Sequence, residues 1–173
     1  EQWDKLFRVV TIKKGQYTYG PQGTLHGSPY APTEEEKDMV ELGFETNSDI
    51  TYRLYDWGRN MPDRPLHVEK VIETVNIPDD QNMGVDIVEK DIDGCKVAYF
   101  IDKPGIFTAF RIRVDENGTF ERKEFMFLFC IDGEAEINGT VIKKGETIFI
   151  PCDYGTLTIK GKAEFGGMTY RNL

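Results

Sequence analysis

A histidine that could bind a metal ion stands at the end of a segment in which glycine and proline recur. Gly15, Pro21, Gly23 and His26 stand at fixed spacing there, and His26 is one of two histidines among 173 residues. The glycines tolerate positive φ, and Pro21 fixes its own φ and stops a strand. We therefore expect two strands joined by a sharp turn, which direct His26 into a small β-barrel as a metal ligand. An ordinary structural histidine is the alternative.

An internal similarity indicates a duplicated barrel unit. Residues 10–15 with Pro21 are similar to residues 140–145 with Pro151, and residues 24–26 are similar to residues 156–158 after a two-residue insertion. The second copy has Thr158 where the first has His26, so only the first copy carries the candidate ligand. Convergence of two unrelated hairpins would give the same pattern.

The remaining pattern predicts an all-β chain with a minor helix. In the first half, strands are expected at residues 40–44 and 49–55, and residues 65–75 carry valine and isoleucine at helical spacing. His67 lies beside this helix and is interpreted as a structural histidine that makes a local hydrogen bond. In the second half, strands are expected at residues 85–90, 96–101, 107–114, 120–130, 134–137, 147–151, 157–159 and 163–170. Short strands at this density are typical of a sandwich or barrel.

Two local patterns in the second half carry further expectations. Asn117-Gly118 and Asn138-Gly139 both predict tight hairpin turns, because Asn-Gly suits the type I′ geometry. Phe125, Phe127 and Phe129 alternate along one predicted strand and are expected to fill the barrel interior.

Composition narrows the class of protein. The net charge of −9 and the pI near 4.8 argue against nucleic-acid binding, which needs a basic surface. There is no apolar run long enough for a membrane helix, and the three cysteines lack a Cys-x-x-Cys pair. We therefore expect a cytoplasmic protein with reduced thiols that binds neither nucleic acid nor a membrane. Because the chain begins with Glu1, we expect that an upstream leader, tag or longer region was removed or that the chain is a fragment.

These motifs together resemble a known enzyme family. The spacing from Gly15 to His26 resembles the second conserved motif of the cupin barrels. Residues 47–59, with the block Ser48 to Arg53, and then residues 64–67 follow in the order and approximate spacing of type I mannose-6-phosphate isomerases. The resemblance is to the carboxyl-terminal half of that family and covers nearly the whole chain. It implies a cupin-like jelly-roll barrel within a duplicated arrangement, with a partial first unit at residues 1–77 and a second barrel without metal ligands at residues 78–173.

The resemblance also implies an activity and two site residues. The family interconverts mannose 6-phosphate and fructose 6-phosphate beside a zinc ion, so the implied partner is a small phosphorylated sugar. His26 falls on a zinc ligand, and Arg53 falls on the active-site arginine, whose permanent cation would stabilise enediolate charge. As an alternative, Arg53 could be a surface strand residue that pairs with Asp49 or Asp56.

The implied metal site is incomplete in this chain. A catalytic zinc ion normally needs three protein ligands, and the family's other ligands would lie upstream of the chain. We therefore expect either a partner segment or subunit that supplies them, or a loss of catalysis. A noncatalytic cupin-like module, with a sugar-binding, regulatory or structural role, is the competing interpretation.

Overall fold

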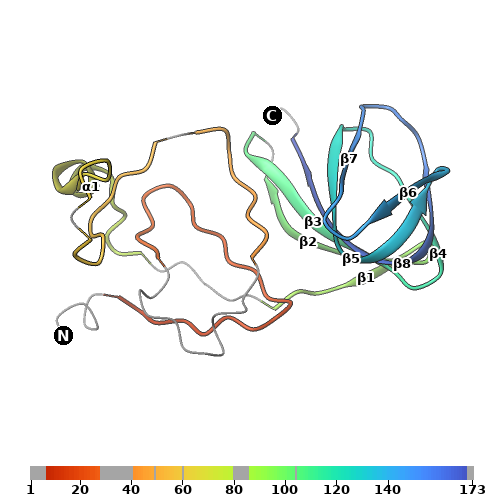
Figure 1. The fold of residues 1–173 in the computed structure, drawn as a ribbon, viewed down its shortest axis with the longest axis horizontal. Helices are drawn as coiled ribbons and strands as arrows, with labels where there is room; N and C mark the ends of the chain where they lie inside the picture. Colours follow the sequence, from red (N-terminus) through yellow and green to blue (C-terminus); the bar gives the residue numbers. More distant parts are fainter. Residues whose placement is uncertain are drawn as a thin grey trace. The chain divides into compact units, whose positions relative to one another are not determined.

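The computed structural model of the chain describes residues 7–27, 41–48, 50–59, 61–79, 86–103 and 105–170. It contains two compact units (Figure 1). The first, here called the amino-terminal unit, comprises Glu1–Lys13 and Thr18–Val85, and the second, the carboxyl-terminal unit, comprises Lys14–Tyr17 and Asp86–Leu173. The predicted division into barrel units at residues 1–77 and 78–173 stays a prediction.

The carboxyl-terminal unit is an antiparallel sheet that curls on itself, as the green to blue arrows of Figure 1 show. Its strands are β1 (Lys90–Ile92), β2 (Cys95–Lys103), β3 (Phe107–Val114), β4 (Asn117–Phe120), β5 (Met126–Ile137), β6 (Thr140–Lys143), β7 (Thr147–Ile150) and β8 (Leu157–Thr169). The main order is β1-β2-β3-β8-β5-β6, with β4 paired to β8 and β7 paired to β5. The two long strands β5 and β8 therefore each pair with three others. This is the mostly antiparallel, cupin-like architecture expected from the sequence.

The interior of this unit is filled with apolar side chains. On β5, Met126, Leu128 and Cys130 are fully buried, whereas Phe127 is 46% exposed. The prediction that the phenylalanines of this strand fill the interior is therefore wrong. Both faces of β5 are apolar here, so alternation alone could not decide which face points inward.

Phe125 and Phe127 instead form an aromatic cluster with Phe149 on the face of the sheet away from the core. The ring of Phe127 lies 5.0 Å from that of Phe149 on β7, and Phe125 lies 6.1 and 6.0 Å from these two rings, centroid to centroid. Phe149 is 52% exposed. These contacts shield part of the aromatic surface, but the cluster remains open to solvent.

The amino-terminal unit is built mainly of turns and loops. Its helix α1 (Val68–Thr74) confirms the predicted helix in shortened form and buries Val71. Strands were expected in the first half within residues 7–27, 41–44 and 50–55. In these described ranges the structure has no strand, and Tyr17 alone forms a single bridge. Their apolar side chains do not pack in the alternating manner of a strand, since Val9 and Ile50 are 87% and 67% exposed.

Two further observations concern the whole of the described chain. None of its described helices has the length and apolar character that crossing a membrane requires. The cytoplasmic location stays a prediction. All three cysteines are free thiols, with Cys95 and Cys130 buried and Cys152 exposed.

Candidate functional site

A buried carboxylate surrounded by arginines lies in the amino-terminal unit. Asp56 is only 6% exposed. Its Oδ1 accepts hydrogen bonds from Nη2 of Arg59 at 2.6 Å and Nη2 of Arg64 at 3.2 Å, while its Oδ2 accepts from Nε of Arg64 at 3.2 Å. Nε of Arg53 lies 3.8 Å from the same Oδ1. We call these four residues the Asp56 cluster.

Two tight turns bring the arginines to the carboxylate. The backbone N–H of Arg59 donates to the carbonyl of Asp56 at 3.0 Å, and the residues between them, Trp57 and Gly58, have φ of 53° and 72°. Positive φ at both central positions reverses the chain tightly and returns Arg59 over Asp56. A second turn, closed by the Arg64 N–H to the Met61 carbonyl at 3.0 Å, brings in Arg64.

The cluster carries more positive than negative charge. The hydrogen bond from Arg64, followed by the charges of Arg59 and Arg64, lowers the pKa of Asp56 below its ordinary value, against the opposing effect of burial. The same hydrogen bond raises the pKa of Arg64. One carboxylate facing three guanidinium groups leaves a surplus of positive charge. Because the side chains of Arg59 and Arg64 are 40% and 38% exposed, this charge is accessible to an anion.

Arg53 is also held through its backbone. Its N–H donates to Nδ1 of His67 at 3.1 Å, and the N–H of His67 donates to the Arg53 carbonyl at 2.7 Å. The Arg53 guanidinium donates from Nη1 to the Pro65 carbonyl at 3.3 Å. Because Nδ1 of His67 accepts a hydrogen bond, the proton of the neutral ring lies on Nε2. Both ends of Arg53 are therefore fixed by residues just before α1.

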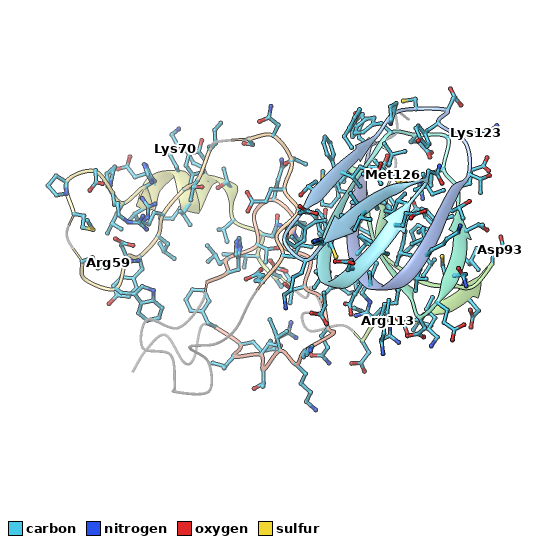
Figure 2. All side chains as sticks on the ribbon, turned by 45° about the vertical axis from the view of Figure 1, so that its right-hand side comes forward. Arg59, Lys70, Asp93, Arg113, Lys123 and Met126 are labelled. Carbon is cyan, nitrogen blue, oxygen red and sulfur yellow. The ribbon has the colours of Figure 1, made fainter. Side chains whose placement is uncertain are left out.

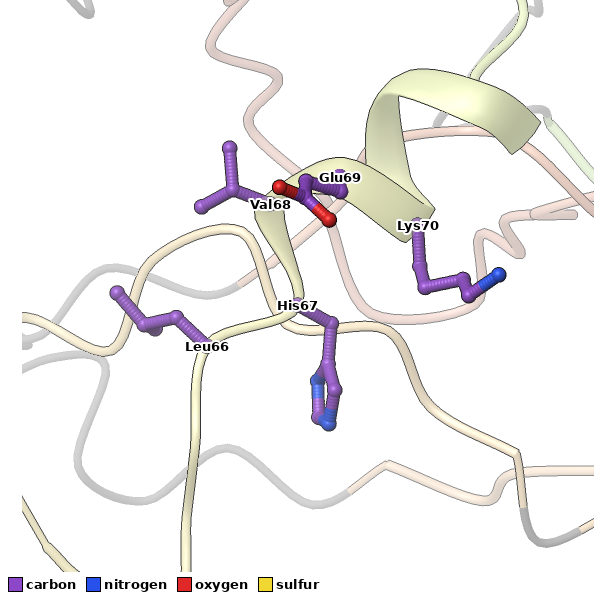
Figure 3. Close-up of a pocket in the computed structure, with 5 residues that line it drawn as sticks. All are labelled: Leu66, His67, Val68, Glu69 and Lys70. Atoms are coloured by element: carbon purple, nitrogen blue, oxygen red, sulfur yellow. The ribbon is translucent and has the colours of Figure 1, made fainter.

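His67 lines a surface depression of about 320 Å³ at the start of α1. Figure 3 shows its ring extending from the chain between Leu66 and Val68, with Glu69 and Lys70 on the following turn. The structural role expected for His67 is present, but its hydrogen bond is not local, because its partner is the backbone N–H of Arg53, fourteen residues away.

His26, the predicted metal ligand, lies elsewhere in the same unit. It is exposed, and its Nδ1 donates to the carbonyl of Thr24 at 2.9 Å. A histidine that donates from Nδ1 to a carbonyl keeps Nε2 available for a metal, which is a common arrangement of zinc ligands. However, His26 shares no hydrogen bond or ion pair with Arg53, Asp56 or His67 among the described residues.

The described residues do not complete a zinc site around His26. The described part of the chain contains no group of three or more His, Cys, Asp and Glu side chains placed to hold a metal ion. A catalytic zinc ion needs about three protein ligands, so the donors present here do not fit one by themselves. The assignments of His26 to a metal and of Arg53 to catalysis stay predictions.

Sequence reasoning named Asp56 only as an alternative ion-pair partner of Arg53. That ion pair is present at 3.8 Å, although Arg53 is half-buried and does not lie in a strand, and Asp49 lies outside the described residues. Arg59 and Arg64 were missed as members of one cluster. The available signal was three arginines and two aspartates, Asp56 and Asp63, within residues 53–64, interrupted by the turn-forming Gly58.

Comparison with known proteins supports the fold and places the chain among its relatives. Residues 99–166 match the family model described as mannose-6-phosphate isomerase, cupin domain. Mannose-6-phosphate isomerase ManA of Bacillus subtilis strain 168 is 29% identical over 171 residues, covering 94% of this chain and 51% of ManA. Probable mannose-6-phosphate isomerase GmuF of the same organism is 28% identical with the same coverage.

A solved structure agrees with this placement at the level of fold. The crystal structure of the mannose 6-phosphate isomerase from Bacillus subtilis superimposes with a TM-score of 0.60 at 23% identity, covering 70% of this chain and 41% of that chain. The chain spans about half the length of the curated relatives it matches. The chain is thus similar to the mannose-6-phosphate isomerases over nearly its whole length, and residues 99–166 match the cupin domain described for that family.

Proposed function

We propose that the chain is one part of a zinc-dependent isomerase that interconverts mannose 6-phosphate and fructose 6-phosphate. The observation that carries the proposal is the extent of the similarity to two curated relatives with that name. It covers 94% of the chain and therefore reaches well beyond residues 99–166, into the unit that contains Arg53.

The Asp56 cluster supplies chemistry that suits this substrate. Proton transfer between C1 and C2 of the open sugar places negative charge on the sugar oxygens, and a fixed guanidinium stabilises such charge. Arg53 is the candidate for this role because its side chain is only 20% exposed, so water screens it less than the other arginines of the cluster. Arg59 and Arg64 offer their accessible positive charge to the phosphate group.

The metal part of the proposal depends on residues outside the described structure. His26 would supply one zinc ligand through Nε2, and an upstream segment or a partner subunit would supply the others. Bound zinc would act as a Lewis acid that orients or polarises the sugar oxygens. No step assigned here to Arg53 depends on it.

The test is a coupled assay of mannose 6-phosphate conversion in a polypeptide that contains this chain with any sequence flanking it in its gene. We expect turnover, and we expect Arg53→Ala to lower kcat at least about 100-fold, as loss of one charge-stabilising donor does. The thermal unfolding midpoint should change little. Arg113→Ala, which removes a more exposed arginine, 39% exposed, on β3 in the carboxyl-terminal unit (Figure 2), should leave kcat unchanged.

Two results would contradict the proposal. Full activity of the Arg53→Ala protein would remove Arg53 from the reaction. Binding of mannose 6-phosphate without turnover, in the presence of added zinc, would favour the noncatalytic sugar-binding alternative.

A further inference from the structure

We propose that Asp56 is the positioning residue of Arg53, and that its negative charge holds the Arg53 guanidinium in the orientation in which it meets the substrate. This inference rests on the proposed function. It assigns a role in the reaction to a residue that need not touch the sugar.

The first support is the unusual environment of Asp56. It is the one charged residue among the buried residues of the described chain. A buried carboxylate requires both hydrogen bonds and countercharge, and Arg59 and Arg64 supply both through three hydrogen bonds. Arg53 is therefore not needed to satisfy Asp56.

The second support is the geometry of Arg53 itself. Its backbone is fixed by the two hydrogen bonds with His67, and its Nη1 is held by the Pro65 carbonyl at 3.3 Å. The opposite side of the guanidinium, at Nε, faces Oδ1 of Asp56 at 3.8 Å. That separation is too long for a hydrogen bond, so the interaction between these atoms depends on charge.

The third support is electrostatic. Three guanidinium groups converge on one carboxylate, and without its charge they would repel one another. Arg53 has the longest separation from the carboxylate and no hydrogen bond to it, so we expect its side chain to move first. A displaced Arg53 would lose its alignment with the developing charge, on which its effect on the rate depends.

This geometry defines a selective substitution, Asp56→Asn. The asparagine Oδ1 can still accept hydrogen bonds from Nη2 of Arg59 and Nη2 of Arg64, whereas the amide group in place of Oδ2 no longer accepts from Nε of Arg64. The side chain carries no charge to hold Arg53. We expect kcat to fall at least about fivefold, with little change in KM for mannose 6-phosphate. Asp63→Asn is the matched variant, because it removes an exposed carboxylate whose charge acts on Arg64 in the same segment. It should leave kcat unchanged.

A double-mutant cycle separates positioning from general destabilisation. If Asp56 acts through Arg53, the Arg53→Ala, Asp56→Asn double variant should have the same kcat as Arg53→Ala alone. Effects that multiply would overturn the inference. Asp56→Glu keeps the charge but displaces it, so it should lower kcat only when Arg53 is present. This variant provides the test if Asp56→Asn does not fold.

A readout that does not need activity keeps the inference separate from the proposed function. NMR of the arginine side chains should show slow rotation of the Arg53 guanidinium in the wild type and in Asp63→Asn. That rotation should be fast in Asp56→Asn. An unchanged Arg53 signal in Asp56→Asn would overturn the inference, whether or not the wild type isomerises mannose 6-phosphate. A wild type without turnover contradicts the proposed function alone.

Discussion

The backbone N–H of Arg53 donates to the ring nitrogen Nδ1 of His67, and the backbone N–H of His67 donates to the carbonyl oxygen of Arg53. These two hydrogen bonds, of 3.1 and 2.7 Å, join positions fourteen residues apart in the sequence. They tie the loop that carries the Asp56 cluster to the start of α1. In the amino-terminal unit, where the described residues form little regular secondary structure, such pairs must supply much of the local order.

The Arg53–His67 pair predicts a specific loss of protection. His67→Leu removes the acceptor of the Arg53 N–H and leaves a part-buried donor unsatisfied, at a cost of about 1–3 kcal/mol. Amide hydrogen exchange of Arg53 should accelerate accordingly. His67→Asn places an oxygen near the position of Nδ1 and should preserve the protection. Equal exchange rates in the wild type and His67→Leu would show that the hydrogen bond does not order this loop.

The Asp56 cluster predicts a dependence of stability on acid. Because the folded-state pKa of Asp56 is lowered from its ordinary value of 3.8, its ionised form favours folding. This contribution is present above that ordinary value and is lost as the pH falls through the lower, folded-state pKa. Asp56→Asn should therefore be less stable than the wild type at about pH 6, and the difference should shrink below about pH 4. Urea unfolding across this range measures it, and a difference that does not vary with pH would contradict the prediction.

The orientation of β5 predicts opposite outcomes for two neighbouring residues. Leu128 is fully buried, so Leu128→Ala should cost about 2–5 kcal/mol of unfolding free energy. Phe127 is 46% exposed, and Phe127→Ala should cost only about 1 kcal/mol, mainly through lost contacts with the aromatic rings beside it. Denaturant unfolding of the two variants distinguishes this arrangement from the inward-facing one, which would reverse their order.

The cysteines predict selective labelling. Burial raises the pKa of the Cys95 thiol to about 11, with a further contribution from Asp93 and Asp91, and burial also raises the pKa of Cys130. Both thiols are inaccessible, whereas Cys152 is exposed. The folded protein should therefore react with one equivalent of a thiol reagent, and the unfolded protein with three. Cys152→Ser should abolish the reaction of the folded protein.

The sequence predicted several carboxyl-terminal strands and turns at or near their observed positions. The range 107–114 coincides with β3, and the Asn138-Gly139 turn joins β5 to β6, with φ of 47° and 88° at the two residues. Asn117-Gly118 is instead part of strand β4. A Cβ at Gly118 would lie 2.5 Å from Sγ of Cys95, so this glycine serves close packing and not a turn. Local composition cannot distinguish these two uses of Asn-Gly.

The amino-terminal unit was predicted less well for a different reason. Its strand prediction assumed that the alternating residues around Gly15 and Arg53 have pairing partners, and pairing depends on segments distant in sequence. The Asp56 cluster is likewise a product of two turns, since only the reversal at Trp57 and Gly58 brings Arg59 back to Asp56. The resemblance of the block around Arg53 indicated the region, but only the folded structure shows that Asp56 is the shared partner of the three arginines.

The position of β8 in the sheet has a consequence for how the protein is made. Strands β3, β4 and β5 all pair with β8, which occupies residues 157–169. The backbone groups on these edges therefore have no partner until β8, the last strand of this sheet in sequence, has been synthesised. Synthesis proceeds at roughly 5–20 residues per second, which leaves the edges of these strands that pair with β8 unpaired for seconds. During that interval the nascent chain exposes the apolar faces of β3 and β5 together. Chaperone binding during translation should therefore be greatest between the emergence of β5 and that of β8.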